Sequence, residues 1–190
     1  MVLFGCNVNR NRVRIVGGAW RSRLIPFPPT KGLRPTPDRV RETLFNWLGQ
    51  DLTGKTCLDL FAGSGALGFE AASRGARRVA MVERDASVFQ ALAANRDRLG
   101  ALAVELTKSD ALEFLRADTG LYDVVFLDPP FDAGYWPRVA AVLPQRLAPG
   151  AMVYHESGAR PELVPGWDVL KESRAGQVRY RLLGRIEGST

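Results

Sequence analysis

From residue 56 onward, short apolar runs alternate with longer amphipathic runs, which is the pattern of a parallel sheet flanked by helices. The apolar runs predict strands and the amphipathic runs predict helices. The predicted strands are 56–60, 78–82, 103–107, 123–127 and 152–156. The predicted helices are 66–74, 86–99, 111–116 and 135–146. We therefore expect an α/β, Rossmann-like fold that binds ligands at the carboxyl ends of its strands.

Both ends of the chain depart from this alternation. Near the start, short apolar runs at 13–16 and 24–27 predict a small antiparallel hairpin. Near the end, the runs 167–172 and 177–183 predict a second hairpin at one edge of the sheet. The expected sheet is therefore seven-stranded and mostly parallel, with a C-terminal antiparallel hairpin.

One further helix is predicted between the first hairpin and the first sheet strand. Thr36 suits its N-cap, Pro37 its first position and Gly49 its end. Its apolar face recurs at helical spacing through Val40, Leu44, Trp47 and Leu48. Backbone N–H groups and arginines at its start predict an anion-binding site.

A glycine-rich turn joins the first sheet strand to the following helix. Gly63, Gly65 and Gly68 have the G-x-G-x-x-G spacing, in which residues without a Cβ let a ligand approach the amino end of a helix. Glu83 ends the next strand, where it can accept hydrogen bonds from a ribose diol. A dinucleotide and S-adenosylmethionine both fit such a corner. Asp59 favours S-adenosylmethionine, because a carboxylate repels a pyrophosphate and attracts the methionine ammonium group.

Residues on neighbouring strand ends complete the expected cofactor site. Asp110 and Ala111 follow the third strand, where Asp110 either hydrogen-bonds the adenine amino group, simply caps the next helix, or does both. The expected cofactor-binding residues are Asp59, Phe61, Ala62, Gly63, Ser64, Gly65, Glu83, Arg84, Asp110, Ala111 and Thr36.

A second polar corner follows the strand at 123–127. Asp128 precedes Pro129, Pro130 and Phe131, so the turn offers acceptors and an aromatic face, while the prolines remove two N–H donors. A planar ring with an exocyclic NH2 group complements this turn. Asp128 and the Pro129 carbonyl would accept the amino hydrogens, and Phe131 would stack on the ring. These four residues are the predicted catalytic residues; a plain proline-rich turn leaves Asp128 unexplained.

Together these motifs resemble those of S-adenosylmethionine-dependent amino methyltransferases, at residues 59–65, Glu83 and 128–131. More narrowly, residues 14–23 and 33–48 resemble the RsmD family, the bacterial guanine-N2 methyltransferases of small-subunit (16S) ribosomal RNA. The resemblance runs from about Arg14 to the end of the chain. It implies a class I methyltransferase fold, S-adenosyl-L-methionine as cofactor, ribosomal RNA as substrate, and an N-terminal segment that helps to close the site.

The length of 190 residues suits one domain with a sizeable core. We expect residues 1–12 to be a disordered leader and residues 13–190 to be a single methyltransferase domain. Within it, 13–50 is the basic segment that covers RNA and cofactor, and 51–190 is the Rossmann-like core.

The net charge of +6 is concentrated at the start of the chain. Residues 1–50 hold nine Lys and Arg against two acids, whereas the remainder is nearly balanced. Such a patch fits a polyanionic partner, most simply nucleic acid, although a solvated basic segment has the same composition. Trp20 either stacks on an RNA base or plugs the hairpin onto the domain. The expected substrate-binding residues are Trp20, Arg21, Arg23, Arg34, Arg39 and Arg41.

The remaining composition excludes several classes of protein. Two cysteines and a single histidine do not make a disulfide framework, and we expect no metal site. No apolar run approaches the length of about 20 residues that spans a membrane. We therefore expect a cytoplasmic protein, and we expect it to be a monomer. The family resemblance implies that its partner is ribosomal RNA within a small-subunit particle.

The expected reaction is methyl transfer to the guanine N2 amine, with the base unstacked into the pocket. Positioning and electrostatics would supply most of the acceleration, since the amine becomes acidic once methylated and its proton can leave to Asp128 or to water. Three alternatives stay open. They are an amino methyltransferase acting on DNA adenine N6 or on protein glutamine, a nicotinamide-dependent oxidoreductase, and a non-catalytic RNA-binding protein.

Overall fold

The computed structural model describes residues 11–30, 33–129, 134–158 and 165–186, and its main element is a seven-stranded sheet with the order β5-β4-β3-β6-β7-β9-β8. The strands are β3 (Thr56–Asp59), β4 (Arg78–Glu83), β5 (Val104–Lys108), β6 (Tyr122–Leu127), β7 (Leu147–Ser157), β8 (Trp167–Ala175) and β9 (Val178–Arg185). The first five run parallel, and β9 is antiparallel to both of its neighbours. The expected sheet and its C-terminal hairpin are confirmed.

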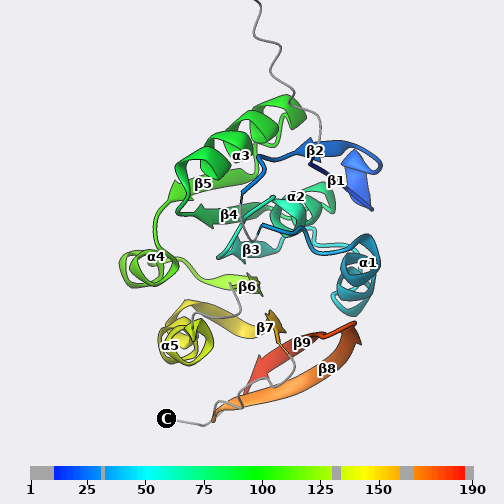
Figure 1. Ribbon diagram of the computed structural model, residues 1–190. Helices are drawn as coiled ribbons and strands as arrows, with labels where there is room; N and C mark the ends of the chain where they lie inside the picture. The colour runs from blue at the N-terminus through cyan, green and yellow to red at the C-terminus, as the bar shows by residue number, and fades with distance from the viewer. Residues whose placement is uncertain (1–10, 31–32, 130–133, 159–164, 187–190) are drawn as a thin grey trace, which may run out of the picture.

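Helices cover both faces of this sheet (Figure 1). The helices are α1 (Asp38–Trp47), α2 (Ala66–Ser73), α3 (Ala86–Leu99), α4 (Ala111–Ala117) and α5 (Tyr135–Val142). α1, α2 and α3 pack on one face, and α4 and α5 pack on the other. Within the described ranges, no helix has the length and apolar character needed to cross a bilayer.

The central strand β6 shows how the sheet separates the two cores. Val124 and Phe126 join the core beneath α1 and α2, whereas Val125 and Leu127 join the core beneath α4 and α5. Because side chains alternate along a strand, Asp128 continues the side of Phe126. The predicted catalytic acid therefore lies on the face that the N-terminal part of the chain covers.

The N-terminal hairpin packs on that same face. β1 (Arg12–Arg14) pairs with β2 (Leu24–Pro26), and a 3-10 turn, η1 (Gly18–Trp20), lies between them. Val13 and Ile25 face each other in the ladder and are buried in the core. Arg12 was expected to end the disordered leader, but it begins β1; residues 1–10 lie outside the described ranges.

A buried ion-pair network fastens the hairpin and α1 to α2. The Arg41 side chain is fully buried and donates to the Arg14 carbonyl at 2.6 Å, to Asp38 at 2.6 Å and to Glu70 at 3.2 Å. Glu70 is buried as well, and it also accepts from the Val16 N–H at 2.8 Å. With the Thr36 carbonyl at 3.1 Å, two carboxylates and two backbone carbonyls thus surround one guanidinium, and the bonds join three separate segments.

Two predicted boundaries differ from the structure. The helix expected at 135–146 is α5 followed by a 3-10 turn, η2 (Leu143–Arg146), which has a proline in its first turn. The cap of α1 also differs: the capping residue is Pro37, and no side chain caps the helix. The Thr36 hydroxyl instead donates to Glu156 at 3.1 Å, because a buried carboxylate there needs a donor.

Candidate active site

The two predicted loops leave adjacent strands at the same edge of the sheet. β3 and β6 are parallel neighbours, with Asp59 paired to Phe126, and the Leu60 N–H donates to the Phe126 carbonyl at 3.1 Å. The strand order reverses here, since β4 and β5 lie on one side of β3 and the later strands lie on the other. Such a reversal is where open α/β sheets bind ligands. The turn after β3 and the turn after β6 therefore lie side by side, in the position of the ligand crevice of such folds.

The glycine turn has the backbone shape that its sequence predicts. Gly63 and Gly65 have φ values of +49° and +80°, in the left-handed region that favours glycine. A Cβ on Gly65 would stand 2.6 Å from the Phe69 ring, and one on Gly68 would stand 2.7 Å from the Met81 sulfur. The turn is therefore tight, and α2 lies close against the sheet.

Ala62 and Ser64 are predicted cofactor residues of the same turn, and both are buried. Little of either residue is exposed in the ligand-free protein, and their contact with a cofactor stays a prediction. Phe61 is half-buried and makes an edge contact with the Tyr135 ring, at a centroid distance of 5.2 Å. Tyr135 was not among the predicted residues; it begins α5 and its ring contacts the glycine turn through Phe61.

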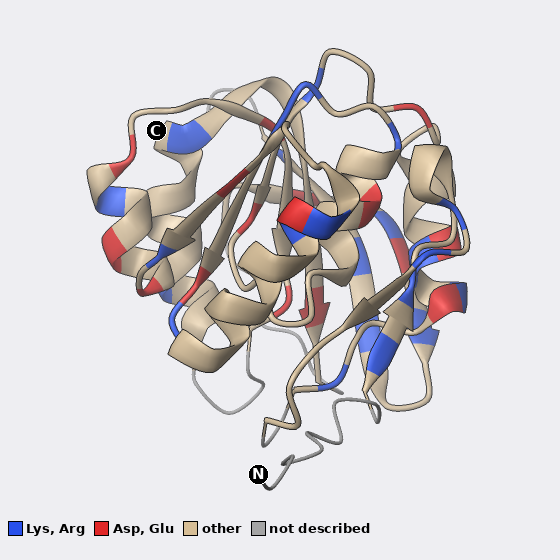
Figure 2. Ribbon diagram, turned by 90° about the horizontal axis from the view of Figure 1, so that it is seen from above, with Lys and Arg blue, Asp and Glu red and all other residues tan. Residues whose placement is uncertain are grey.

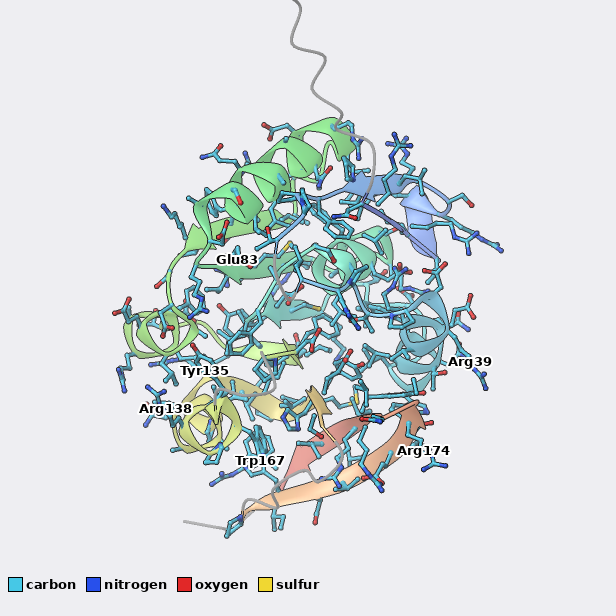
Figure 3. The ribbon with its side chains drawn as sticks, in the orientation of Figure 1. Arg39, Glu83, Tyr135, Arg138, Trp167 and Arg174 are labelled. Atoms are coloured by element: carbon cyan, nitrogen blue, oxygen red, sulfur yellow. The ribbon has the colours of Figure 1, made fainter. Side chains whose placement is uncertain are left out.

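Glu83 binds the glycine turn directly. One carboxylate oxygen accepts from the Gly63 N–H at 3.0 Å, and the other accepts from the Asp85 N–H at 2.7 Å. Figure 3 shows Glu83 at the end of β4, beside the turn that follows β3. These bonds to an ionised acceptor fix the turn against the next strand end. Glu83 thus lies beside the glycine turn, at the end of β4 as expected, and its role as an acceptor for a ribose diol stays a prediction.

Asp59 lies beneath the turn. Its side chain is 2 % exposed and accepts from the Gly68 N–H at 2.9 Å, in the first turn of α2. Burial raises its pKa to about 7, and the nearby Glu83 charge acts in the same direction. Asp59 was expected to attract an ammonium group. Because Asp59 is buried, it would attract the ammonium group through its charge rather than by direct contact.

Asp110 and Ala111 begin α4 beside the cofactor corner. The Asp110 carboxylate accepts from the Leu112 N–H at 2.8 Å and is the N-cap of α4, which is one of the two roles expected for it. Arg84 follows β4 and donates to the Tyr135 hydroxyl at 3.4 Å. Both side chains therefore lie around the end of β4 and β5, where the adenosine half of the cofactor was predicted.

Asp128 and Pro129 follow β6, and both are half-buried. Burial raises the pKa of Asp128 well above its usual range, with the negative charges of Glu156 and then Asp59 adding to the effect. Three acids therefore gather beneath one crevice. Pro130 and Phe131, the other predicted catalytic residues, lie outside the described residues.

Glu156 is a buried acid of the crevice that the sequence analysis did not select. It lies near the end of β7, and the Tyr154 hydroxyl donates to its Oε1 at 2.6 Å. The Thr36 hydroxyl donates to the same oxygen. Burial raises the pKa of Glu156, while the two hydroxyl groups oppose that rise. A signal for it existed, since Glu156 ends the predicted strand 152–156, and the selected acids Asp59 and Glu83 also lie at or near the ends of predicted strands.

The predicted RNA-binding arginines divide into two groups. Arg21, Arg23, Arg34 and Arg39 are exposed, whereas Arg41 is fully buried. Figure 2 marks the basic positions of the N-terminal segment, and Figure 3 shows Arg39 pointing away from α1. The prediction of Arg41 as an RNA contact is therefore corrected: its guanidinium is occupied by Glu70, Asp38 and two backbone carbonyls.

Trp20 lies at the hairpin tip. Its ring is half-buried against the core, and its backbone N–H donates to the Ser73 hydroxyl at 2.9 Å. This placement favours the alternative in which Trp20 fixes the hairpin to α2 over the one in which it stacks on RNA. Among the described residues, no group of His, Cys, Asp and Glu has the arrangement of a metal site.

Comparison with known proteins shows the family to which this chain belongs. The family model described as "Conserved hypothetical protein 95" matches residues 13–184. Ribosomal RNA small subunit methyltransferase D from Escherichia coli is 44% identical over 179 residues, which is 92% of this chain and 90% of that protein. The corresponding protein from Haemophilus influenzae is 42% identical, over 91% of this chain and 94% of that protein.

A solved structure agrees with these matches. The putative methyltransferase yhhF from Escherichia coli has a TM-score of 0.83 and 45% identity, over 92% of this chain and 98% of that chain. The expected resemblance is therefore confirmed along nearly the whole sequence. The chain belongs to the family of ribosomal RNA small subunit methyltransferase D.

Proposed function

We propose that this protein transfers a methyl group from S-adenosyl-L-methionine to the exocyclic N2 amine of one guanine in 16S ribosomal RNA. The observation that carries the proposal is the adjacency of β3 and β6. It puts a glycine turn held by Glu83 and an acceptor-rich turn headed by Asp128 on one crevice. Family membership supports the same activity, because the curated relatives are named as methyltransferases of small-subunit ribosomal RNA.

The cofactor corner fits S-adenosylmethionine better than a dinucleotide. Gly63 and Gly65 have left-handed backbone conformations, and their Cβ positions would overlap Leu33 and Phe69, so the tight turn depends on both glycines. A tight glycine turn of this kind suits close approach of a nucleoside to the backbone. Asp59, Glu83 and Asp128 surround the crevice with carboxyl groups. A cationic ligand would favour the charged forms of Asp59 and Asp128, whose pKa values burial raises, whereas a pyrophosphate would be disfavoured there. When bound, S-adenosylmethionine would supply an electrophilic methyl group on a sulfonium.

The proposed work of the second turn is to hold the amine. The Asp128 carboxylate and the Pro129 carbonyl accept the two amino hydrogens, which turns the nitrogen lone pair toward the methyl group. The raised pKa of Asp128 in the free protein falls when a positive charge enters the crevice, so its acceptor form is restored on ligand binding. Positioning of this kind accounts for a large share of the acceleration in transfer reactions.

The proposed role of residues 13–50 is to cover the cofactor and to bind RNA, within one methyltransferase domain that includes β1 from Arg12. Leu33 supports this role, because its side chain lies 2.8 Å from where a Gly63 Cβ would be. Exposed arginines on the same segment suit contacts with phosphates. We further propose that the protein acts as a cytoplasmic monomer on an assembling small-subunit particle.

Presenting methyl-labelled S-adenosylmethionine with three substrates tests the proposal. The substrates are small-subunit particles that lack the modification, duplex DNA and a mixture of bacterial proteins. We expect label in 16S ribosomal RNA alone. Label in DNA or in protein would show that the substrate is one of the other amino-group targets and not ribosomal RNA. No label together with bound NAD would indicate an oxidoreductase.

A further inference from the structure

Glu156 has no task in the reaction as proposed above, yet it is buried at the crevice. Its Oε1 accepts from both the Tyr154 and the Thr36 hydroxyl groups. Its Oε2 has no hydrogen-bond partner among the residues that the structure describes, and it is not among the fully enclosed polar atoms. A carboxylate held at one oxygen, with the other oxygen open, is the arrangement of a ligand acceptor.

Glu156 lies beside Asp128. β6 and β7 are parallel, with Phe126 paired to Tyr154 and Leu127 to His155. The next pair along this register is Asp128 with Glu156, so the two side chains point to the same face from strands about 4.8 Å apart. The influence of the Glu156 charge on Asp128 agrees with this proximity.

The acceptors at these two strand ends match one edge of guanine. Guanine has three hydrogens in a row on that edge, two on N2 and one on N1. The proposed function uses Asp128 and the Pro129 carbonyl for the N2 hydrogens, which leaves the N1 hydrogen to be matched. We propose that Glu156 determines base specificity by accepting the guanine N1–H through Oε2. This inference rests on the proposed function and names the feature of the base that the site reads.

Other bases with an amino group fail this match. Adenine and cytosine each have a ring-nitrogen acceptor beside the amine, so a carboxylate at that position faces a lone pair. The repulsion and the unpaired buried acceptor both weaken binding, which is how a polar site rejects a close analogue strongly. A pocket with acceptors alone for the amine would admit all three bases.

The Tyr154 and Thr36 hydroxyl groups make a sharp substitution possible. In Glu156→Gln, both hydroxyl groups hold the amide oxygen at the Oε1 position, so the amide NH2 occupies the Oε2 position. A donor then faces N1. This variant should disfavour guanine and accept a base whose N1 is an acceptor.

The experiment compares guanine with 2-aminopurine, which keeps the N2 amine but has no hydrogen on N1. Each base is placed at the mapped target position of ligated 16S ribosomal RNA that is assembled into small-subunit particles. We expect the wild-type protein to prefer guanine by at least about 100-fold in kcat/KM. In Glu156→Gln the preference should fall below about tenfold or reverse. Glu105→Gln, an exposed acid at the far strand β5, should keep the wild-type preference.

The outcomes separate this inference from the proposed function. Transfer to guanine and 2-aminopurine at similar rates by the wild-type protein would overturn the role of Glu156 and leave the methyl transfer intact. An unchanged preference in Glu156→Gln would also overturn the role of Glu156, since Asp128 would then recognise both the N1 and the N2 hydrogens. Absence of any transfer to guanine would overturn both. Calorimetry with S-adenosylhomocysteine shows whether the variant folds. If it does not, Glu156→Asp takes its place, since the shorter side chain draws the carboxylate back from N1 and should lower the preference. The variant is needed because 2-aminopurine also lacks O6, so the wild-type ratio alone does not assign the preference to N1.

Discussion

Replacing Arg41 by methionine is expected to detach the N-terminal segment from the core. The side chain donates four hydrogen bonds, to the Thr36 and Arg14 carbonyls and to the carboxylates of Glu70 and Asp38. Methionine has a similar length but no donor. Removing one partner of a buried ion pair typically costs 3–5 kcal/mol, because a buried charge is left uncompensated.

The remaining contacts of Glu70 place the expected loss at the low end of that range. Its other oxygen keeps the Arg74 guanidinium, with a contact of 2.9 Å, so the carboxylate is not fully abandoned. We therefore expect Arg41→Met to lower the free energy of unfolding by about 3 kcal/mol. For a chain of this size, that corresponds to a fall of roughly 6–12 °C in Tm.

Urea unfolding of four variants measures this effect: Arg41→Met, Arg39→Met, Glu70→Gln and the double variant. Arg39→Met changes an exposed arginine on the same helix and should alter stability by no more than about 0.5 kcal/mol. The double variant Arg41→Met with Glu70→Gln should recover about 1–3 kcal/mol relative to the sum of the single losses, since the uncompensated charge is gone. The rate of methyl transfer by Arg41→Met should also fall, because the N-terminal segment is no longer held against the core. A loss below about 1 kcal/mol for Arg41→Met would refute the view that this network holds the segment in place.

Three more predictions concern the crevice itself. Gly65→Ala should weaken S-adenosylmethionine binding by at least tenfold in calorimetry and lower stability by about 2 kcal/mol, because it forces a left-handed alanine whose Cβ overlaps the Phe69 ring; unaltered binding would count against a tight turn. Glu83→Gln should weaken cofactor binding about 10–100-fold, since the turn loses its charge-assisted acceptor; an affinity within twofold of wild type would remove Glu83 from the site. Asp128→Asn should reduce methyl transfer at least 100-fold while stabilising the ligand-free protein by about 1 kcal/mol at pH 8. The folded state raises the pKa of Asp128, so the ionised acid destabilises the fold as pH rises through that range, and the gain in the asparagine variant should shrink toward pH 5; a gain that does not change with pH would contradict the raised pKa.

Much of the fold could be predicted because each element has a local signal. The alternation of apolar runs marks the five parallel strands and the helices between them, and β3 to β6 each lie within a residue of the predicted ranges. The glycine turn and its acid on β4 were also readable, since Gly63, Gly65 and Glu83 come from the ends of consecutive strands. Their hydrogen bond is the consequence of the parallel register of β3 and β4.

The residues that were misplaced depend on contacts between distant parts of the sequence. In the sequence Arg41 resembles any other arginine of a basic segment, and only the fold shows that its side chain is buried beside Glu70. Thr36 has the local signal of an N-cap, but a carboxylate 120 residues away takes its hydroxyl. Glu156 was passed over because β7 was chosen only for its apolar run. Local sequence gives the periodicity of an element, whereas the partner of a buried polar group depends on the tertiary fold.

The most direct test of the central claim is nucleoside analysis of the reaction product. Methyl-labelled S-adenosylmethionine is incubated with the protein and with small-subunit particles from cells that lack it, and the 16S ribosomal RNA is then digested to nucleosides. The account predicts label in N2-methylguanosine at a single position with the wild-type protein, and almost none with Asp128→Asn. Label on an adenosine or on a ring nitrogen of guanine, or full labelling by Asp128→Asn, would contradict an amine held at the end of β6.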